Sequence, residues 1–241
     1  TFGTDSIMIG DTTTGTIDAA DYNTGLGVNV FSALTTGDYN TAVGYRALED
    51  NTTGSRNTGV GRLSIGNNTS GDFNTAIGYG SLAANTTADS NTAVGYAAMS
   101  TNTTGTNNTA AGVNALVTNS SGDQNVAVGE QALYANTTAS YNTAIGYDAL
   151  RANTTSSNNT AVGHNSLDSN TGTENTAVGS GSLRTLSTGN YNTAVGYECL
   201  GLATTSDQNT AVGYYALGAA TTGHSNTAMG SAALDAMTTS L

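Results

Sequence analysis

The chain has 241 residues, a formal net charge of −12 and only five Lys and Arg residues. So few cations disfavour nucleic acids and anionic membrane surfaces as partners, because phosphate groups are bound by clustered cations. Cys199 is the single cysteine, so no intrachain disulfide can form. The sequence has no run of about 18 apolar residues, so we expect no direct membrane insertion of this segment.

A unit of 17 residues, first seen at Ser6, is repeated along the chain, and one copy is shortened to 16. A fixed short period is typical of a solenoid, in which each unit forms one coil and stacks on the next. We therefore predict a single all-β domain over residues 1–241, a β-solenoid or β-roll. Its fourteen coils begin at residues 6, 23, 40, 57, 74, 91, 108, 125, 142, 159, 175, 192, 209 and 226.

Each copy opens on a motif like the N-T-A-V-G that begins at Asn91. The second position is Thr in most copies but accepts Ile7 and Val126, and the fourth position is aliphatic. Alternation of period two predicts a short β-strand with positions two and four on the inward face. The third position, Ala or Gly, would then form a small outward face.

A second short strand is predicted at positions eight and nine, where a small residue precedes a large apolar one such as Leu48. We expect the leucines of position nine to meet the aliphatic residues of position four inside the coil. The N-T-T-G segment that follows predicts a turn. The single deletion falls at Thr171–Thr173, which marks that place as a loop. Asn of position twelve is replaced by Leu186 in one copy, so this column should point inward.

The fifth position is Gly in all fourteen copies. Such a position requires either a positive φ or the close approach of another backbone. Leu, Ile, Val and Phe total only 38 of 241 residues, so the core is thin and partner chains would help to stabilise it. We therefore predict a parallel homotrimeric fibre in which small residues such as Ala42 face another chain. The predicted interface glycines are Gly44, Gly61, Gly78, Gly95, Gly112, Gly129, Gly146, Gly163, Gly179, Gly196 and Gly213.

The unit N-T-A-V-G-Y-x-A-L-x-x-N-T-T-G-x-x resembles the repeats of tail-fibre-type proteins of phages and bacteria. It is more distantly similar to the head repeats of trimeric autotransporter adhesins, whose S-V-A-I-G motif parallels the S-I-M-I-G of residues 6–10. The resemblance covers nearly the whole chain. It implies a trimeric, extended β-roll that serves as a fibre shaft or adhesive head, often in attachment.

The sixth position holds an aromatic column that also accepts charged residues such as Arg62 and Glu130, so it should face water at least in part. Its tyrosines could stack on sugar rings, or they could simply cover the edge of the coil. The candidate glycan-contact residues are Tyr45, Tyr79, Tyr96, Tyr147, Tyr197 and Tyr214.

No catalytic constellation is visible in the sequence. His164 and His224 lack paired ligands, and Cys199 stands in the small eighth column in place of Ala. Asp recurs at position sixteen, where a calcium ladder is conceivable, but other residues interrupt the column. We interpret these carboxylates as solvated turn residues. We expect no enzyme activity, no cofactor and no metal site.

The sequence thus predicts a structural fibre segment, a shaft or head, of an extracellular, cell-surface or virion attachment appendage, cut from a longer chain. The expected partners are further copies of the chain and a host-surface glycan or protein receptor. One alternative is a glycan-binding adhesin shaft that uses the tyrosines. Another is an ice-binding solenoid that uses the doubled Thr of the turn, such as Thr52 and Thr53; a third is a free extracellular filament.

Overall fold

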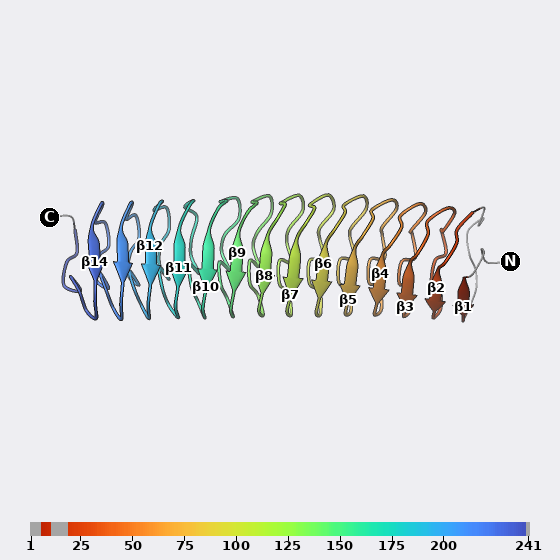
Figure 1. Ribbon diagram of the computed structural model, residues 1–241, viewed down its shortest axis with the longest axis horizontal. Helices are drawn as coiled ribbons and strands as arrows, with labels where there is room; N and C mark the ends of the chain where they lie inside the picture. The colour runs from red at the N-terminus through yellow and green to blue at the C-terminus, as the bar shows by residue number, and fades with distance from the viewer. Residues whose placement is uncertain (1–5, 11–18, 240–241) are drawn as a thin grey trace. The chain divides into compact units, whose positions relative to one another are not determined.

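The computed structural model describes residues 6–10 and 19–239 (Figure 1). The chain divides into two compact units, Thr1–Asp123 and Gln124–Leu241. Each unit is a β-solenoid in which one short strand per coil pairs in parallel with the strand of the next coil. The predicted all-β solenoid of 17-residue coils is therefore confirmed. Among the described residues there is no helix long and apolar enough to cross a bilayer.

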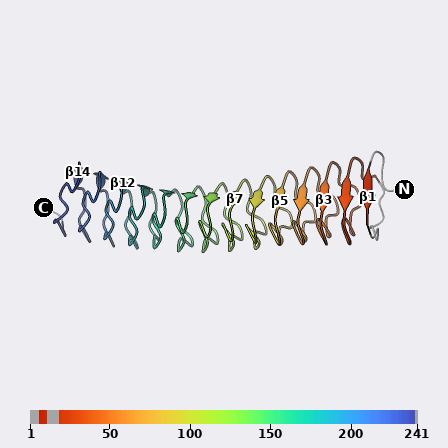
Figure 2. The same ribbon diagram turned by 90° about the horizontal axis from the view of Figure 1, so that it is seen from below.

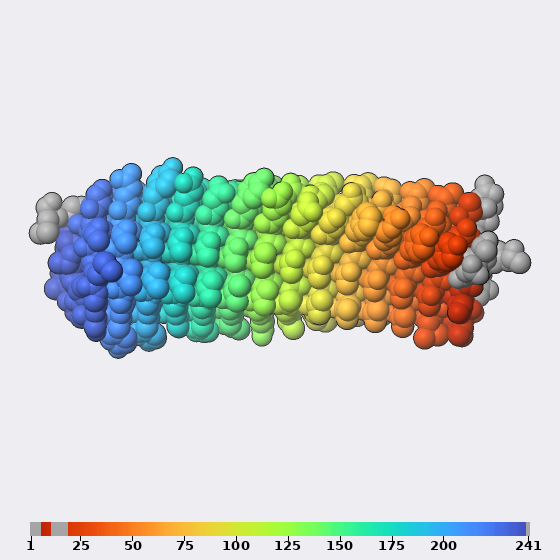
Figure 3. Space-filling view, viewed as in Figure 1, coloured from red at the N-terminus to blue at the C-terminus, as the bar shows by residue number. Residues whose placement is uncertain are grey.

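The strands of each unit follow one another in chain order (Figures 1 and 2). Pairing partners are one coil apart, as in Thr41 opposite Thr58. Space-filling atoms of successive coils form successive bands of colour within each unit (Figure 3). The first unit contains β1 (Ile7–Ile9), β2 (Thr24–Leu26), β3 (Thr41–Val43), β4 (Thr58–Val60), β5 (Thr75–Ile77), β6 (Thr92–Val94) and β7 (Thr109–Ala111). The second contains β8 (Val126–Val128), β9 (Thr143–Ile145), β10 (Thr160–Val162), β11 (Thr176–Val178), β12 (Thr193–Val195), β13 (Thr210–Val212) and β14 (Thr227–Met229).

The strands present the opposite face to the interior from the one predicted. Ala42 of position three is fully buried, whereas Ile77 and Val94 of position four are 43% and 38% exposed. β1 carries Met8 at position three, but from β2 onward this position is always Ala or Gly, because the interior there is too narrow for a larger side chain. In β2, where this position is Gly25, an added Cβ would already lie 3.1 Å from Val30 and 3.3 Å from Phe31. The expectation that positions two and four face inward was therefore wrong.

The predicted second strand is absent wherever positions eight and nine are described; in the first coil they lie outside the described residues. Position nine instead adopts a left-handed conformation, with φ of 50° at Leu48 and 52° at Leu82. In this conformation the amide of Leu48 points along the solenoid and donates to the carbonyl of Ser64 in the next coil (3.1 Å). Bonding between coils thus offsets a conformation that costs a bulky residue about 1–2 kcal/mol.

The core of each unit combines the leucines of position nine with the alanines of positions three and eight. Two asparagine columns are buried beside them, at positions one and twelve. The Asn74 side chain accepts a hydrogen bond from the backbone N–H of Asn91 in the next coil (3.0 Å) and donates one to the backbone carbonyl of Ala88 (2.8 Å). Asn85 of position twelve also donates to Ala88 (3.0 Å). Both columns therefore satisfy polar groups that the turn would otherwise leave unpaired, and the inward orientation predicted for position twelve is confirmed.

The invariant glycine is required by the adjacent coil of the same chain. A Cβ placed on Gly95 would lie 2.4 Å from the carbonyl oxygen of Gly112, and φ at Gly95 is 136°. Gly44 meets Gly61 in the same way. Positive φ and close backbone approach both apply, as predicted, but the approaching backbone described here is the next coil and not another chain.

The shortened coil, Asn159–Glu174, places its missing residue in a loop, as predicted. β10 still pairs in register with β11, with Thr160 opposite Thr176. In this loop the Asn170 side chain accepts from the amide of Gly172 (3.1 Å) and donates to its carbonyl (2.8 Å). The side-chain oxygen of Asn153, one coil earlier, is buried and makes no hydrogen bond. The deletion therefore interrupts the asparagine ladder but not the sheet.

Candidate functional site

The outward face of the strands carries a column of threonines from position two. None of their hydroxyls makes a hydrogen bond to another described residue of the chain. The turn threonines behave differently, because Thr52 donates to the carbonyl of Thr69 (2.7 Å) and Thr69 to that of Thr86 (3.0 Å). The hydroxyls of the position-two threonines are therefore available to water or a partner. They are Thr24, Thr41, Thr58, Thr75, Thr92, Thr109, Thr143, Thr160, Thr176, Thr193, Thr210 and Thr227.

Beside the threonines, the same face carries the aliphatic column of position four. Ile77 of the first unit and Ile145 of the second are 43% and 40% exposed, and the end positions Ile9 and Met229 are more exposed still. Within residues 6–10 and 19–239, no strand contains a charged residue. We call these two columns, formed by positions two and four of successive coils, the outward face of each compact unit. Each unit thus presents an uncharged face of alternating hydroxyl and aliphatic columns.

The tyrosines of position six are exposed, as predicted, and they stack on one another along the solenoid. The rings of Tyr79 and Tyr96 lie 5.3 Å apart and those of Tyr197 and Tyr214 lie 5.5 Å apart, nearly parallel in both pairs. Tyr147 stacks on His164. A ring whose face is covered by its neighbour offers its edge and its hydroxyl to solvent. A sugar ring can therefore stack only on those tyrosines whose ring face is not covered by a neighbouring ring.

A second aromatic column, at position seventeen, was missed by the sequence reasoning. Tyr22 and Tyr39 stack with their centroids 4.9 Å apart, and Phe73 and Tyr141 are also exposed. Recurrence of aromatic residues at this position was a visible signal. The position precedes the strand by two residues, just as position six follows it by two. Aromatic columns therefore border the strands on both sides.

The carboxylates of position sixteen bind backbone groups of the preceding coil. Asp72 accepts from the amide of Ser55 (2.6 Å), and Asp123 accepts from that of Thr106 (2.7 Å). The interpretation of this column as merely solvated was therefore incomplete. Within residues 6–10 and 19–239, no group of three or more His, Cys, Asp and Glu side chains is arranged to hold a metal ion.

Cys199 is fully buried, and its thiol lies 3.2 Å from the carbonyl oxygen of Ala211. Burial raises the pKa of Cys199 to about 11, which keeps the thiol protonated and unreactive. His224 accepts through Nδ1 from the amide of Asp207 (3.2 Å), and this nitrogen is 3.7 Å from the Asp207 carboxylate. Both side chains are thus held by hydrogen bonds to the backbone of an adjacent coil.

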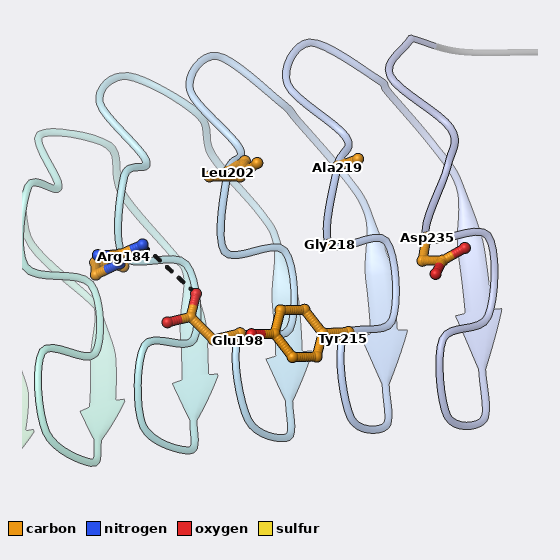
Figure 4. Close-up of a pocket in the computed structure, with 7 residues that line it drawn as sticks. All are labelled: Arg184, Glu198, Leu202, Tyr215, Gly218, Ala219 and Asp235. Atoms are coloured by element: carbon orange, nitrogen blue, oxygen red, sulfur yellow. Dashed lines mark ion pairs between the residues drawn. The ribbon is translucent and has the colours of Figure 1, made fainter.

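The second unit contains a hollow of about 400 Å³ between successive coils (Figure 4). An ion pair joins Arg184 Nη2 to Glu198 Oε2 across 3.7 Å, and the Tyr215 ring lies beside Glu198. Desolvation by burial is the main cause that raises the pKa of Tyr215. The lining mixes opposite charges with small apolar surfaces and does not pair a nucleophile with a base. The lining residues are Arg184, Glu198, Leu202, Tyr215, Gly218, Ala219 and Asp235.

No known protein family, curated protein or solved structure matches the chain.

Proposed function

We propose that the chain is a structural segment of an attachment fibre on a virion or cell surface, built from parallel copies that associate through their outward faces. The observation that carries this proposal is the exposed aliphatic column of position four. Burying that column against another copy would remove apolar surface from water, at roughly 25 cal/mol per Å². The proposed role is structural and involves no catalysis and no cofactor.

Self-association suits this face better than it suits the rest of the surface. The chain carries 17 acidic and 5 basic residues, so copies repel one another wherever charged surfaces meet. The outward face lacks those charges and repeats the same two columns coil after coil. Identical uncharged faces can meet around a rotation axis, and a threefold axis is the arrangement that the tail-fibre resemblance implies.

The proposal is tested by placing charge on the outward face. We expect the wild-type chain to be a trimer by native mass spectrometry and sedimentation, and Ile77→Asp with Val94→Asp and Ile145→Asp to give a folded monomer. The matched control adds the same three charges at exposed turn positions, as Thr53→Asp, Thr104→Asp and Thr138→Asp, and should remain trimeric. A wild-type chain that is a stable, folded monomer would refute the proposal.

Ice binding is a second candidate, because the threonines of position two face outward with unbonded hydroxyls. Neighbouring hydroxyls repeat at the strand spacing of about 4.8 Å, and the aliphatic column lies about 6.6 Å further along each strand. Such an array could order water into an ice-like lattice. In the turn, the first Thr of each pair suits this role less well, because the hydroxyls of Thr52 and Thr103 donate to carbonyls of the chain itself.

The two candidates compete for the same face, so they predict opposite results. A monomer that shows thermal hysteresis, lost on Thr75→Val with Thr92→Val but kept on Thr52→Val with Thr103→Val, would establish ice binding. A trimer without hysteresis favours the fibre. The glycan-binding shaft is tested separately, because Tyr79→Ala, Tyr96→Ala and Tyr147→Ala should then reduce binding on a glycan array.

A further inference from the structure

Two of the five arginines, unlike the other three, form no ion pair with a described carboxylate. Arg46, Arg151 and Arg184 each pair with a carboxylate, from Glu49, Asp148 and Glu198 respectively. Among the described residues no carboxylate forms an ion pair with Arg56 or Arg62. In a chain with a net charge of −12, these two exposed guanidinium groups are cations without an ion-pair partner among the described residues.

Aromatic rings hold both groups in place. The guanidinium carbon of Arg56 lies 5.5 Å from the ring centroid of Tyr39 and 5.2 Å from that of Phe73. That of Arg62 lies 5.7 Å from the Tyr45 centroid and 5.2 Å from the Tyr79 centroid. Each cation therefore sits between a ring of the coil before and a ring of the coil after. A ligand can reach it only from the open side of the column.

The strand between them fixes the distance between the two cations. Arg56 precedes β4 (Thr58–Val60) by two residues, and Arg62 follows it by two. Five residues lie between them, so their Cα atoms are at most about 20–22 Å apart. The surface between them is the uncharged outward face of β4, formed by Thr58 and Val60. No other strand has arginine on both sides at this spacing.

We propose that Arg56 and Arg62 form a binding site for an anionic polysaccharide, with one acidic group of the polymer on each guanidinium. Guanidinium groups donate paired hydrogen bonds to the oxygens of carboxylates and sulfates, and positioning by rings reduces the entropy lost on binding. A polymer with repeated acidic groups can engage both cations at once, which a single acidic sugar cannot do.

The neighbouring groups also fit a sugar polymer. Arg62 Nη1 donates to the Tyr79 hydroxyl (2.8 Å), which leaves the hydroxyl proton of Tyr79 available to an acceptor on the ligand. The nearest column of acids, with Asp38 and Asp72 at position sixteen, opposes an anion, but the Asp72 carboxylate is already bonded to the amide of Ser55. In the second unit the Tyr147–His164 and Tyr197–Tyr214 stacks contain no arginine, so they lack this site.

This inference goes beyond the fibre proposal and names a ligand class for attachment. It competes with self-association at β4, because a polymer that joins Arg56 to Arg62 crosses Thr58 and Val60, which association through the outward faces would bury. The two can fail separately, because binding is measured on the soluble chain whatever its oligomeric state. A trimer that binds no polyanion would leave the fibre proposal intact. A monomer that binds a polyanion would refute the fibre proposal and support the arginine site.

Binding is measured by biolayer interferometry on immobilised dextran sulfate, polygalacturonate and neutral dextran, in buffer of physiological salt. We expect binding to at least one of the charged polymers and not to dextran, and the preferred polymer identifies sulfate or carboxylate as the recognised group. Arg56→Gln with Arg62→Gln should weaken binding about tenfold or more, since a charge-assisted hydrogen bond is worth about 1.5–3 kcal/mol. The single Arg56→Gln variant should give an intermediate loss.

Two control variants distinguish binding by the ring-stacked guanidinium groups from attraction by net positive charge. Arg46→Gln with Arg151→Gln removes the same charge from paired arginines and should change binding less than twofold. Arg56→Lys with Arg62→Lys keeps the charge but not the planar donor and should bind several-fold more weakly. Failure to bind either charged polymer, equal loss in the paired-arginine control, or full binding by the lysine variant would each overturn the proposal. Circular dichroism and melting temperature confirm that each variant is folded.

Discussion

At the residue scale, two glycines of the first compact unit show why position five is always Gly and position seven is not. Gly95 of position five has φ of 136°, and an added Cβ would collide with the carbonyl of Gly112. Gly80 of position seven has φ of 61° and open space around it. Other coils place Ala97 or Arg46 at position seven with a similar φ. Crowding by the next coil, and not positive φ alone, therefore excludes side chains at position five.

We predict that Gly95→Ala destabilises the chain by about 3 kcal/mol or more, because the β6 coil must move away from the next one. Gly80→Ala, the matched control, has open space for the added Cβ and should cost only the left-handed conformation, about 1–2 kcal/mol. Chemical denaturation measures both. Equal effects of the two variants would show that the glycine column has another cause.

Asp168 provides a prediction for pH dependence. Burial raises the pKa of Asp168, and the nearby charge of Asp148 raises it further, against smaller opposing effects of Arg151 and Arg184. A carboxyl whose pKa is raised by folding destabilises the fold when it is charged, so its cost is present above the raised pKa and vanishes below the unfolded value of about 3.9. We expect Asp168→Asn to raise the melting temperature at pH 7 and to have no effect near pH 3. A lower melting temperature at pH 7 would show that the charge is stabilising.

At the scale of one coil, the sequence predicted the repeat and the strand correctly but not which way the strand faces. The third-position Ala was read as an outward surface, although its buried neighbour is a large Leu that leaves room only for Ala. A strand was predicted at Leu48 because a small residue precedes a large apolar one there in every regular coil. Bonds between coils instead hold Leu48 in a left-handed conformation that leucine rarely adopts. Adjacent apolar positions eight and nine conflicted with period two and could have indicated this. The stacking of Arg56 and Arg62 on rings depends on neighbouring coils and was beyond any single motif.

The two asparagine columns should differ in how strongly they stabilise a coil. Asn74→Ala removes the acceptor of the buried Asn91 amide and the donor to Ala88, and a buried group left unpaired costs about 1–3 kcal/mol. Asn85→Leu should cost less, because position twelve already accommodates Leu186 in another coil. Thermal unfolding of the two variants measures the difference. A larger loss for Asn85→Leu would mean that the position-twelve ladder is the stronger of the two.

At the scale of the whole molecule, charge and the outward faces act against each other. The net charge of −12 keeps copies apart, whereas the uncharged aliphatic columns favour contact between them. Salt screens repulsion between exposed charges over a Debye length of about 10 Å at 0.1 M and leaves apolar burial largely unchanged. The balance between the two therefore depends on ionic strength.

We predict that association tightens severalfold when sodium chloride is raised from 10 mM to 300 mM, and that it tightens again as the pH approaches the isoelectric point of about 4.1. Sedimentation velocity over a concentration series gives the dissociation constant at each condition. The triple Asp variant of the outward face should remain monomeric at both salt concentrations, because its added charges lie within the contact itself. If salt instead dissociates the wild-type assembly, ion pairs must hold it together, and the interface must lie on the charged turns and not on the threonine and aliphatic columns.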